Sequence, residues 1–278
     1  MGSETATQLP LIDFSKIYLH QSTPDDWNSV KIQVHEALTE YGFFRASMAG
    51  MSPEFRSSLF GSLDQLFDLP METKLKSISD KPFHGYIGHS PTMPLYESMA
   101  VPDAPVAGEV EAFTNFFWPH GNPLYWLDRT VRKMVIESMG LEKYSDDHMD
   151  STKHLLRVAK YRGPDTDESI TGLTSHIDKT TLSILYQNEV AGLELETKSG
   201  EWIRVKQSPD SFTVFVGEET RYSLGLFSVP KPSYITRVPH ELVTEEHPLL
   251  FNPFDYDEFL KHMFTGKIGA NADALDTY

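Results

Sequence analysis

The sequence contains no cysteine. This excludes a disulfide-stapled scaffold, a cysteine-ligated zinc site, a cysteine-bound iron–sulfur cluster and a catalytic thiol. Positive charge is also scarce, because 24 Lys and Arg stand against 40 Asp and Glu, for a formal net charge of −16 at pH 7. An acidic chain lacks the basic footprint that nucleic-acid phosphates require, so no nucleic-acid partner is expected.

Long apolar runs are missing as well. No stretch approaches the roughly 18–20 apolar residues of a membrane span, so no membrane partner is expected. The first six residues are acidic and lack the apolar region of a secretory signal, which predicts a cytoplasmic protein. The chain of 278 residues is nevertheless 40% hydrophobic and 12% aromatic, which excludes disorder and predicts a globular chain with a sizeable core. We expect a monomer.

Helical periodicity dominates the first half of the chain. Thr23, Pro24 and Asp26 combine a capping hydroxyl, a proline at the first helical position and an acidic first turn, and apolar residues then recur at steps of three and four up to Gly42. Similar patterns predict helices over residues 52–69 and 127–139. Residues 82–108 are rich in Pro, Gly and Ser and are expected to be loop with short strands.

After about residue 154 the pattern changes to that of strands. The predicted strands are short, β-branched and aromatic, and they cover residues 155–161, 181–186, 192–196, 202–206, 212–216 and 222–229. Strands at this spacing with no helices between them favour an antiparallel sandwich or barrel. With a short helix over residues 254–260, the fold class is α+β. The expected core residues are Trp27, Val34, Leu38, Phe60, Leu63, Leu156, Val158, Leu182, Ile184, Leu193, Ile203, Val214, Val216, Leu224 and Leu226.

The strongest candidate for a metal site is the pair His176 and Asp178. On a strand, residues i and i+2 point to the same face, so both side chains can reach one ion. This suits an iron(II) facial site, which takes two histidines and one carboxylate. Taken alone, such a pair is more often a surface pair in a turn.

Three further residues favour a site for a small carboxylate. Arg221 and Ser223 place a guanidinium and a hydroxyl on one face of a predicted strand, and Arg pairs a carboxylate through two parallel hydrogen bonds. Tyr161, at the end of an earlier strand, adds a phenol. The alternatives are a solvated arginine and an ordinary core tyrosine.

Together with several further segments, these residues resemble the plant 2-oxoglutarate- and iron(II)-dependent dioxygenases over nearly the whole chain. Residues 9–13 (LPLID), 41–44 (YGFF) and 69–74 (LPMETK) are similar to motifs of that superfamily's N-terminal region. Residues 81–86 (KPFHGY) and 118–122 (WPHGN) resemble its AOP-like branch, which includes enzymes of glucosinolate side-chain modification.

The resemblance implies a double-stranded β-helix (jelly roll) core with N-terminal helices. It places an N-terminal helical and mixed region at 1–122, the iron and 2-oxoglutarate core at 123–236 and a helical tail at 237–278. The implied cofactors are Fe(II) and 2-oxoglutarate, with ascorbate as a reductant, and the implied substrate is a small molecule of plant specialised metabolism. Phe113, Phe116, Phe117, Tyr86 and Phe227 are candidate walls for an apolar or aromatic substrate.

The resemblance also assigns roles to single residues. His176 and Asp178 would bind the metal, and Arg221 and Ser223 would bind the distal carboxylate of 2-oxoglutarate. Tyr161 lies in Lys-Tyr-Arg-Gly-Pro, a variant of the family's Asn-Tyr-Tyr-Pro strand, and is assigned to the same cosubstrate.

The pattern breaks at the second iron-binding histidine, which the family carries shortly before its Arg-x-Ser pair. No histidine lies between Asp178 and His240, and Glu218 runs directly into Glu219 as though a segment were absent there. A second shortening follows residues 122–123. The sequence therefore predicts a jelly roll that lacks one core strand and an incomplete metal triad, unless Glu218 or Glu219 supplies a carboxylate.

Three functional interpretations remain open at this stage. The first is a dioxygenase that is inactive or impaired as written, because its triad is incomplete. The second is a non-enzymatic relative that binds 2-oxoglutarate or a partner. The third is a cupin-like binding barrel without iron.

Overall fold

The computed structural model describes residues 9–48, 53–79, 84–90, 93–102, 123–163, 176, 178–190, 192–206, 208–215 and 223–264. Its helices and strands follow in this order: β1 (Leu11–Asp13), α1 (Ser15–Tyr18), α2 (Pro24–Glu40), β2 (Phe43–Ser47), α3 (Pro53–Phe67), α4 (Met71–Lys74), η1 (Leu75–Ser77), β3 (Gly85–Ser90), β4 (Met93–Pro102), α6 (Pro123–Ser138), η2 (Glu142–Tyr144), α7 (Ser145–Asp150), β5 (Thr152–Tyr161), β6 (Leu182–Gln187), β7 (Glu194–Glu196), β8 (Trp202–Arg204), β9 (Ser211–Phe215), β10 (Ser223–Pro230), β11 (Ile235–Thr236), η3 (His240–Leu242), β12 (Phe254–Asp255) and α8 (Tyr256–Phe264).

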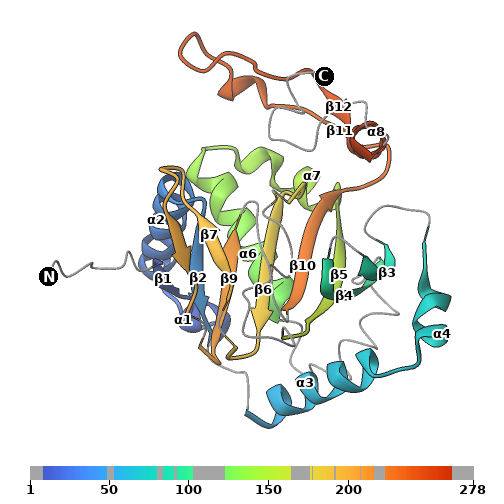
Figure 1. The fold of residues 1–278 in the computed structure, drawn as a ribbon. Helices are drawn as coiled ribbons and strands as arrows, with labels where there is room; N and C mark the ends of the chain where they lie inside the picture. Colours follow the sequence, from blue (N-terminus) through green and yellow to red (C-terminus); the bar gives the residue numbers. More distant parts are fainter. Residues whose placement is uncertain are drawn as a thin grey trace, which may run out of the picture.

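The centre of the molecule is an eight-stranded sheet in the order β1-β2-β9-β6-β10-β5-β4-β3 (Figure 1). β1 and β2 pair in parallel, and the remaining neighbours pair antiparallel. β7 and β8 form a separate two-stranded ribbon, and β11 pairs with β12. Strands from the first hundred residues and from the second half of the chain therefore build one sheet.

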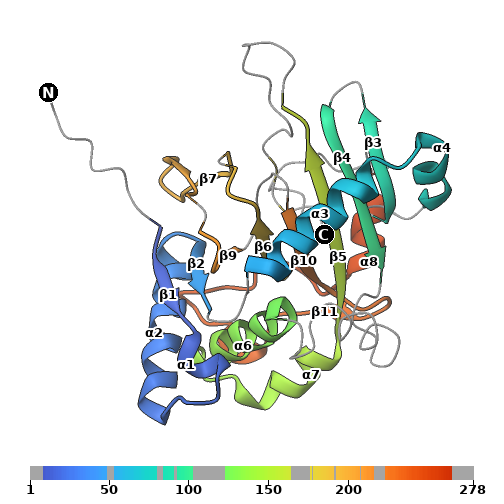
Figure 2. The same cartoon turned by 90° about the horizontal axis from the view of Figure 1, so that it is seen from below.

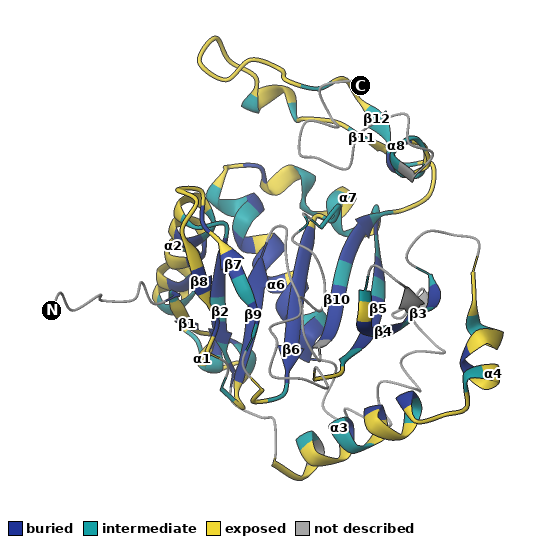
Figure 3. Ribbon diagram, viewed as in Figure 1, coloured by how far each residue is buried: buried dark blue, intermediate teal, exposed yellow. Residues whose placement is uncertain are grey.

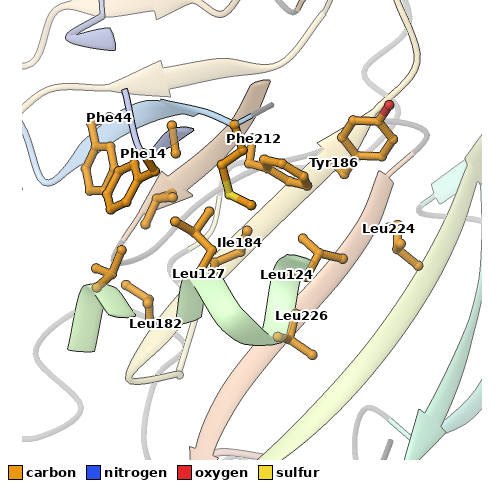
Figure 4. Packing of buried hydrophobic residues seen from close by; sticks show 14 of the residues in the cluster. Phe14, Phe44, Leu124, Leu127, Leu182, Ile184, Tyr186, Phe212, Leu224 and Leu226 are labelled. Atoms are coloured by element: carbon orange, nitrogen blue, oxygen red, sulfur yellow. The ribbon is translucent and has the colours of Figure 1, made fainter. Parts of the chain in front are cut away.

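Helices cover one face of this sheet. α6 lies across the strands and α2 lies beside it, as the two views show (Figures 1 and 2). The apolar side of α6 meets the sheet through Leu124 and Leu127, which point toward Ile184 and Leu226 on the central strands (Figure 4). Burial of this apolar surface is the main stabilising contribution to the fold.

The helix α2 begins where its sequence signals predicted. The Thr23 side chain accepts a hydrogen bond from the Asp26 backbone N–H, and the Asp26 carboxylate accepts from the Thr23 backbone N–H. This reciprocal capping box satisfies two N–H groups that otherwise lack helical partners. Gly42 follows the helix with φ +87°, a conformation that favours glycine.

The expected elements agree well with the structure. The helices predicted near residues 23–42, 52–69, 127–139 and 254–260 and the six predicted strands are all present, with small shifts at their ends. Eleven of the fifteen expected core residues are buried, while Trp27, Leu38 and Phe60 are partly buried against the same cluster. Val216 lies outside the described residues.

Two expectations need correction. Residues 82–108, expected to be loop with short strands, contain the strands β3 and β4, of which β4 is 10 residues long. Residues 43–47, for which no strand was predicted, form β2. Both β2 and β4 pair on two sides within the sheet, so tertiary pairing overrides weak local signals there.

The expected loss of a core strand does not interrupt the main sheet. β10 begins at Ser223 and bonds along its length to both β5 and β6. In the part of the chain that the structure describes, the second layer of the jelly roll is represented by the short β7–β8 ribbon.

The chain after β10 extends beyond one end of the sheet. Burial colouring shows the sheet strands largely buried and this extension largely exposed (Figure 3). Its exposed apolar residues include Leu249 at 49% and Leu250 at 73%. Among the described residues, no helix has the length and apolarity that crossing a membrane requires.

Candidate functional site

The two faces of the central sheet differ in chemistry. In the register, Val158 pairs with Leu224 and Leu224 pairs with Tyr186, and all three belong to the apolar cluster beneath the helices. The alternate residues of the same strands point to the opposite face, because side chains alternate along a strand. We call this opposite side the polar face; its described polar side chains include Ser98, Arg157, Tyr161, Ser183 and Gln187.

His176 and Asp178 lie just before β6, at one end of the polar face. The distance between His176 Nε2 and Asp178 Oδ1 is 3.4 Å, and the two side chains are 39% and 13% exposed. The two side chains thus lie together, as expected from the sequence, but neither residue is part of a strand. The expected strand alternation is therefore not seen at these two residues.

Ser183 orients the Asp178 carboxylate. Its Oγ donates a hydrogen bond of 2.7 Å to Asp178 Oδ2, and it lies 2.9 Å from Thr180 Oγ1. Ser183 is on the polar face of β6 and is fully buried. One carboxylate oxygen is thereby fixed by the sheet, while the other faces the His176 imidazole.

The helix α8 contacts the same segment from the C-terminal side. The Tyr256 hydroxyl donates a hydrogen bond to the Lys179 carbonyl, one residue after Asp178. Burial, followed by the negative charges of Asp178 and Asp257, raises the pKa of the Tyr256 phenol above its ordinary value of 10.0. Sequence reasoning missed Tyr256, because an amphipathic tail helix carries no signal of what it packs against.

The predicted 2-oxoglutarate residues are only partly described. Tyr161 ends β5, is half-buried, and its ring centroid lies 5.0 Å from that of Tyr96. Ser223 begins β10, opposite Ala159 on one side and Gln187 on the other. Arg221 lies outside the described residues.

The donor set can be tested against iron(II). An imidazole and a carboxylate are donors that iron(II) accepts, and a facial triad takes three such groups. The described residues contain no group of three or more His, Asp or Glu side chains that could hold a metal. His240 is 84% exposed and paired with Glu241, and it does not join His176 and Asp178. Two donors therefore fit, and the described residues supply no third.

Two further positions refine the site. Arg157 was not anticipated from the sequence; it is 8% exposed on the polar face and donates a hydrogen bond of 2.5 Å to Ser98 Oγ. Its alternation with Tyr161 on β5 could have indicated it. Tyr86 was expected as a pocket wall on the polar face. It lies on the helix-covered face instead, where it pairs with Met99 and its hydroxyl donates a hydrogen bond to Glu97.

The other expected substrate wall with a described position is Phe227, on the polar face of β10 opposite Ser183. Its ring lies over Gly225, where an added Cβ would come within 2.7 Å of a ring carbon. Glycine at position 225 thus makes room for the Phe227 ring. Residues 113, 116 and 117 lie outside the described residues, as do Glu218 and Glu219.

Comparison with known families identifies both parts of the chain. Residues 9–100 match the family described as "non-haem dioxygenase in morphine synthesis N-terminal". Residues 152–247 match the "2OG-Fe(II) oxygenase superfamily", and this range includes His176, Asp178 and Ser223.

Similar curated proteins come from Arabidopsis thaliana. The "Probable 2-oxoglutarate-dependent dioxygenase AOP1.2" is 41% identical, with 96% of this chain and 94% of that protein covered. The alignment runs over 307 residues, more than the 278 of this chain, so the relative contains stretches that this chain lacks. A "Probable inactive 2-oxoglutarate-dependent dioxygenase AOP2" is 30% identical, with 92% of this chain and 93% of that protein covered.

Solved structures share the fold. The dioxygenase for auxin oxidation from rice superimposes with a TM-score of 0.75 at 24% identity, covering 97% of this chain and 99% of that chain. JOX2 in complex with 2OG, Fe and JA gives 0.70 at 20% identity, covering 94% and 87%. The jelly-roll fold is thereby shown, and the named relatives favour the enzyme over the non-enzymatic alternative. The chain belongs to the 2OG-Fe(II) oxygenase superfamily, with the AOP-like plant dioxygenases among its relatives.

Proposed function

We propose that this chain is a 2-oxoglutarate- and Fe(II)-dependent dioxygenase in which His176 and Asp178 bind the iron. The observation that carries the proposal is the close pair of these two side chains at one end of the polar face, with Ser183 holding the Asp178 carboxylate. Tyr161, Arg221 and Ser223 are proposed to bind 2-oxoglutarate. The family match over residues 152–247 supports these roles.

The chain's own residues bind and orient the reactants. A bound iron supplies oxygen activation, with 2-oxoglutarate as the co-reductant. Asp178 presents a fixed carboxylate oxygen to the metal, and His176 contributes its neutral imidazole. Arg221 forms a bidentate pair with a carboxylate, and α8 keeps the Asp178 segment in place through Tyr256 and Lys179.

The proposed site holds iron weakly. Iron(II) stands low in the order of affinities among divalent metals, so a site reduced from three protein ligands to two retains it poorly. Activity is accordingly impaired relative to relatives with a complete triad. A carboxylate from Glu218 or Glu219 would raise both the affinity and the rate.

The proposed substrate is a small plant metabolite with an apolar or aromatic part. Phe227 on the polar face supports this, and the buried Arg157 favours a polar or anionic group on the same molecule. The acting form is proposed to be a cytoplasmic monomer of specialised metabolism, and the ranges 1–122, 123–236 and 237–278 are proposed as its domains.

The test is succinate formation from 2-oxoglutarate after anaerobic loading with excess Fe(II). We expect slow succinate release that rises with Fe(II) concentration and disappears in His176→Ala and Asp178→Ala. His247→Ala, which changes an exposed histidine outside the site, serves as the control and keeps the wild-type rate. Succinate formation unaffected by His176→Ala would contradict the proposed metal site.

A further inference from the structure

Gln187 is an unusual buried residue on the polar face. It is the last residue of β6 and is only 1% exposed, yet neither Oε1 nor Nε2 has a hydrogen-bond partner. In folded proteins nearly all buried polar atoms are paired, and each exception calls for an explanation. A carboxamide with both of its polar atoms unpaired indicates a partner other than the protein itself.

Two other polar side chains on the same face find partners within the chain. Ser183 donates to Asp178, and Arg157 donates to Ser98, both on the same face as Gln187. Arg45, Arg56, Asn188 and Thr236 each leave one buried polar atom unpaired, and Arg45 Nη2 and Arg56 Nη1 are hydrogen-bonded. Among the described residues, only Gln187 leaves two such atoms unpaired, so a structural role does not account for it.

The position of Gln187 indicates which group it meets. It lies directly opposite Ser223 in the β6–β10 register, and Ser223 in turn lies opposite Ala159, two residues before Tyr161. At the other end of the same strand face, Ser183 holds Asp178. Gln187 lies four residue steps along the strand from Ser183, which corresponds to roughly 13 Å.

Extended 2-oxoglutarate is shorter than this span, so the contacts at its two ends, Asp178 with a metal at one end and the Gln187 side chain at the other, would make up the difference. With its 2-oxo acid end at His176 and Asp178, 2-oxoglutarate directs its distal carboxylate along β6 toward Ser223 and Gln187. We infer that the Gln187 carboxamide is a positioning contact that donates from Nε2 to this distal carboxylate. The inference rests on the proposed function and adds a residue to the cosubstrate site.

The experiment compares two acids on the wild type and on Gln187→Met, with Mn(II) in place of Fe(II) and binding measured by calorimetry. Methionine has nearly the same volume but no hydrogen-bonding carboxamide. 2-Oxopentanoate has the same carbon chain as 2-oxoglutarate without the distal carboxylate. Gln33→Met changes an exposed glutamine of α2 and is the matched control.

We expect wild type and Gln33→Met to prefer 2-oxoglutarate equally, and Gln187→Met to lose about tenfold or more of that preference. Thermal melting of the ligand-free protein gives a second readout. Since the substitution removes two unpaired buried polar atoms, the Tm of Gln187→Met should rise by about 2–4 °C.

Two results would overturn the inference while leaving the proposed function intact. One is an unchanged preference for 2-oxoglutarate in Gln187→Met. The other is a Tm that falls by several degrees, which would mean that the carboxamide serves the fold. A wild type that binds neither acid would instead overturn the proposed function and this inference together.

Discussion

The two faces of the central sheet use the same strands for different purposes. On the helix-covered face, β5, β6 and β10 contribute Leu156, Ile184 and Leu226 to an apolar cluster sealed by α6 and α2. On the polar face, the alternating residues of the same strands contribute Arg157, Ser183 and the unpaired Gln187. The polar face also contributes to stability, because Leu185, Phe215 and Phe43 belong to a second buried apolar cluster there. Strand parity therefore separates the main core from the polar side chains, but not stability from ligand chemistry as a whole.

The helix-covered side of the sheet also contains a buried cluster of charged side chains. Asp128, Arg132 and His154 are buried beneath α6, where Arg132 Nε donates to Asp128 Oδ2 at 3.0 Å and His154 Nε2 lies 2.9 Å from the same oxygen. Ser228 donates to the other carboxylate oxygen. Burial raises the pKa of Asp128, but the hydrogen bond with His154 and the charge of Arg132 outweigh it and hold that pKa below its ordinary value of 3.8.

The charged cluster satisfies its members with one another, whereas the polar face leaves capacity for a ligand. Breaking the cluster should therefore affect folding, and altering the polar face should affect binding.

The largest effect is expected for Asp128→Ala. It leaves Arg132 as an uncompensated buried charge, which costs about 3–5 kcal/mol of unfolding free energy. Urea denaturation measures the change. Asp64→Ala removes an exposed carboxylate 3.9 Å from Lys160 and should cost less than about 1 kcal/mol. Equal losses in the two variants would contradict the assignment of the cluster to stability.

The second largest effect is expected from a substitution that creates a cavity beneath α6. Leu127 is fully buried, so Leu127→Ala should lower the free energy of unfolding by about 2–5 kcal/mol. Leu250→Ala, at a residue that is 73% exposed, should change it by about 0.5 kcal/mol or less. Both are read from the same denaturation curves, and a large loss at Leu250 would show that the C-terminal extension is packed in solution.

Tyr256→Phe tests the contact between α8 and the segment of His176 and Asp178, where we propose that a metal binds. Loss of the hydroxyl removes one hydrogen bond to the Lys179 carbonyl, with an expected cost of about 0.5–1.5 kcal/mol. Because that bond fixes the backbone next to Asp178, Mn(II) affinity should also fall by a few-fold. Tyr144→Phe, whose hydroxyl bonds Glu241 on the surface, should leave Mn(II) affinity unchanged. Equal Mn(II) affinities in the two variants would show that the contact of α8 with Lys179 does not contribute to metal binding.

The smallest expected effect is the contribution of His148 to the pH dependence of the free energy of unfolding. Burial, together with the charge of Arg132, lowers the pKa of His148 below its ordinary value of 6.5. The unfolded chain then binds a proton more readily than the folded chain, so the free energy of unfolding decreases as pH falls below about 6.5. His148→Gln should flatten this decrease, while the exposed His247→Gln should not. A decrease that is unchanged in His148→Gln would refute the linkage.

Much of the fold follows from local patterns, and the site follows from them only in part. Thr23 and Pro24 predict the start of α2, and the β-branched runs predict β5, β6 and β10, because helix capping and strand alternation are local effects. β2 and β4 are stabilised by partners far away in sequence, which local reasoning does not capture. His176 and Asp178 were identifiable from their spacing, although neither lies in a strand.

Other parts of the site depend on tertiary structure. Tyr256 reaches Lys179 only because α8 returns to the sheet, and Gln187 stands out only once burial and hydrogen bonding are known. The alternation of Arg157 with Tyr161 was visible in the sequence. Its meaning depends on which face the helices cover, and that is decided by the whole fold.

The central claim is that the polar face binds a metal and 2-oxoglutarate through His176 and Asp178. Anaerobic calorimetry of 2-oxoglutarate binding, with and without Fe(II), tests it most directly. We expect one weak site whose affinity for 2-oxoglutarate rises with Fe(II). His176→Ala should lose this dependence on Fe(II), and His247→Ala should retain it. Binding that is indifferent to Fe(II), or equally strong in His176→Ala, would contradict it.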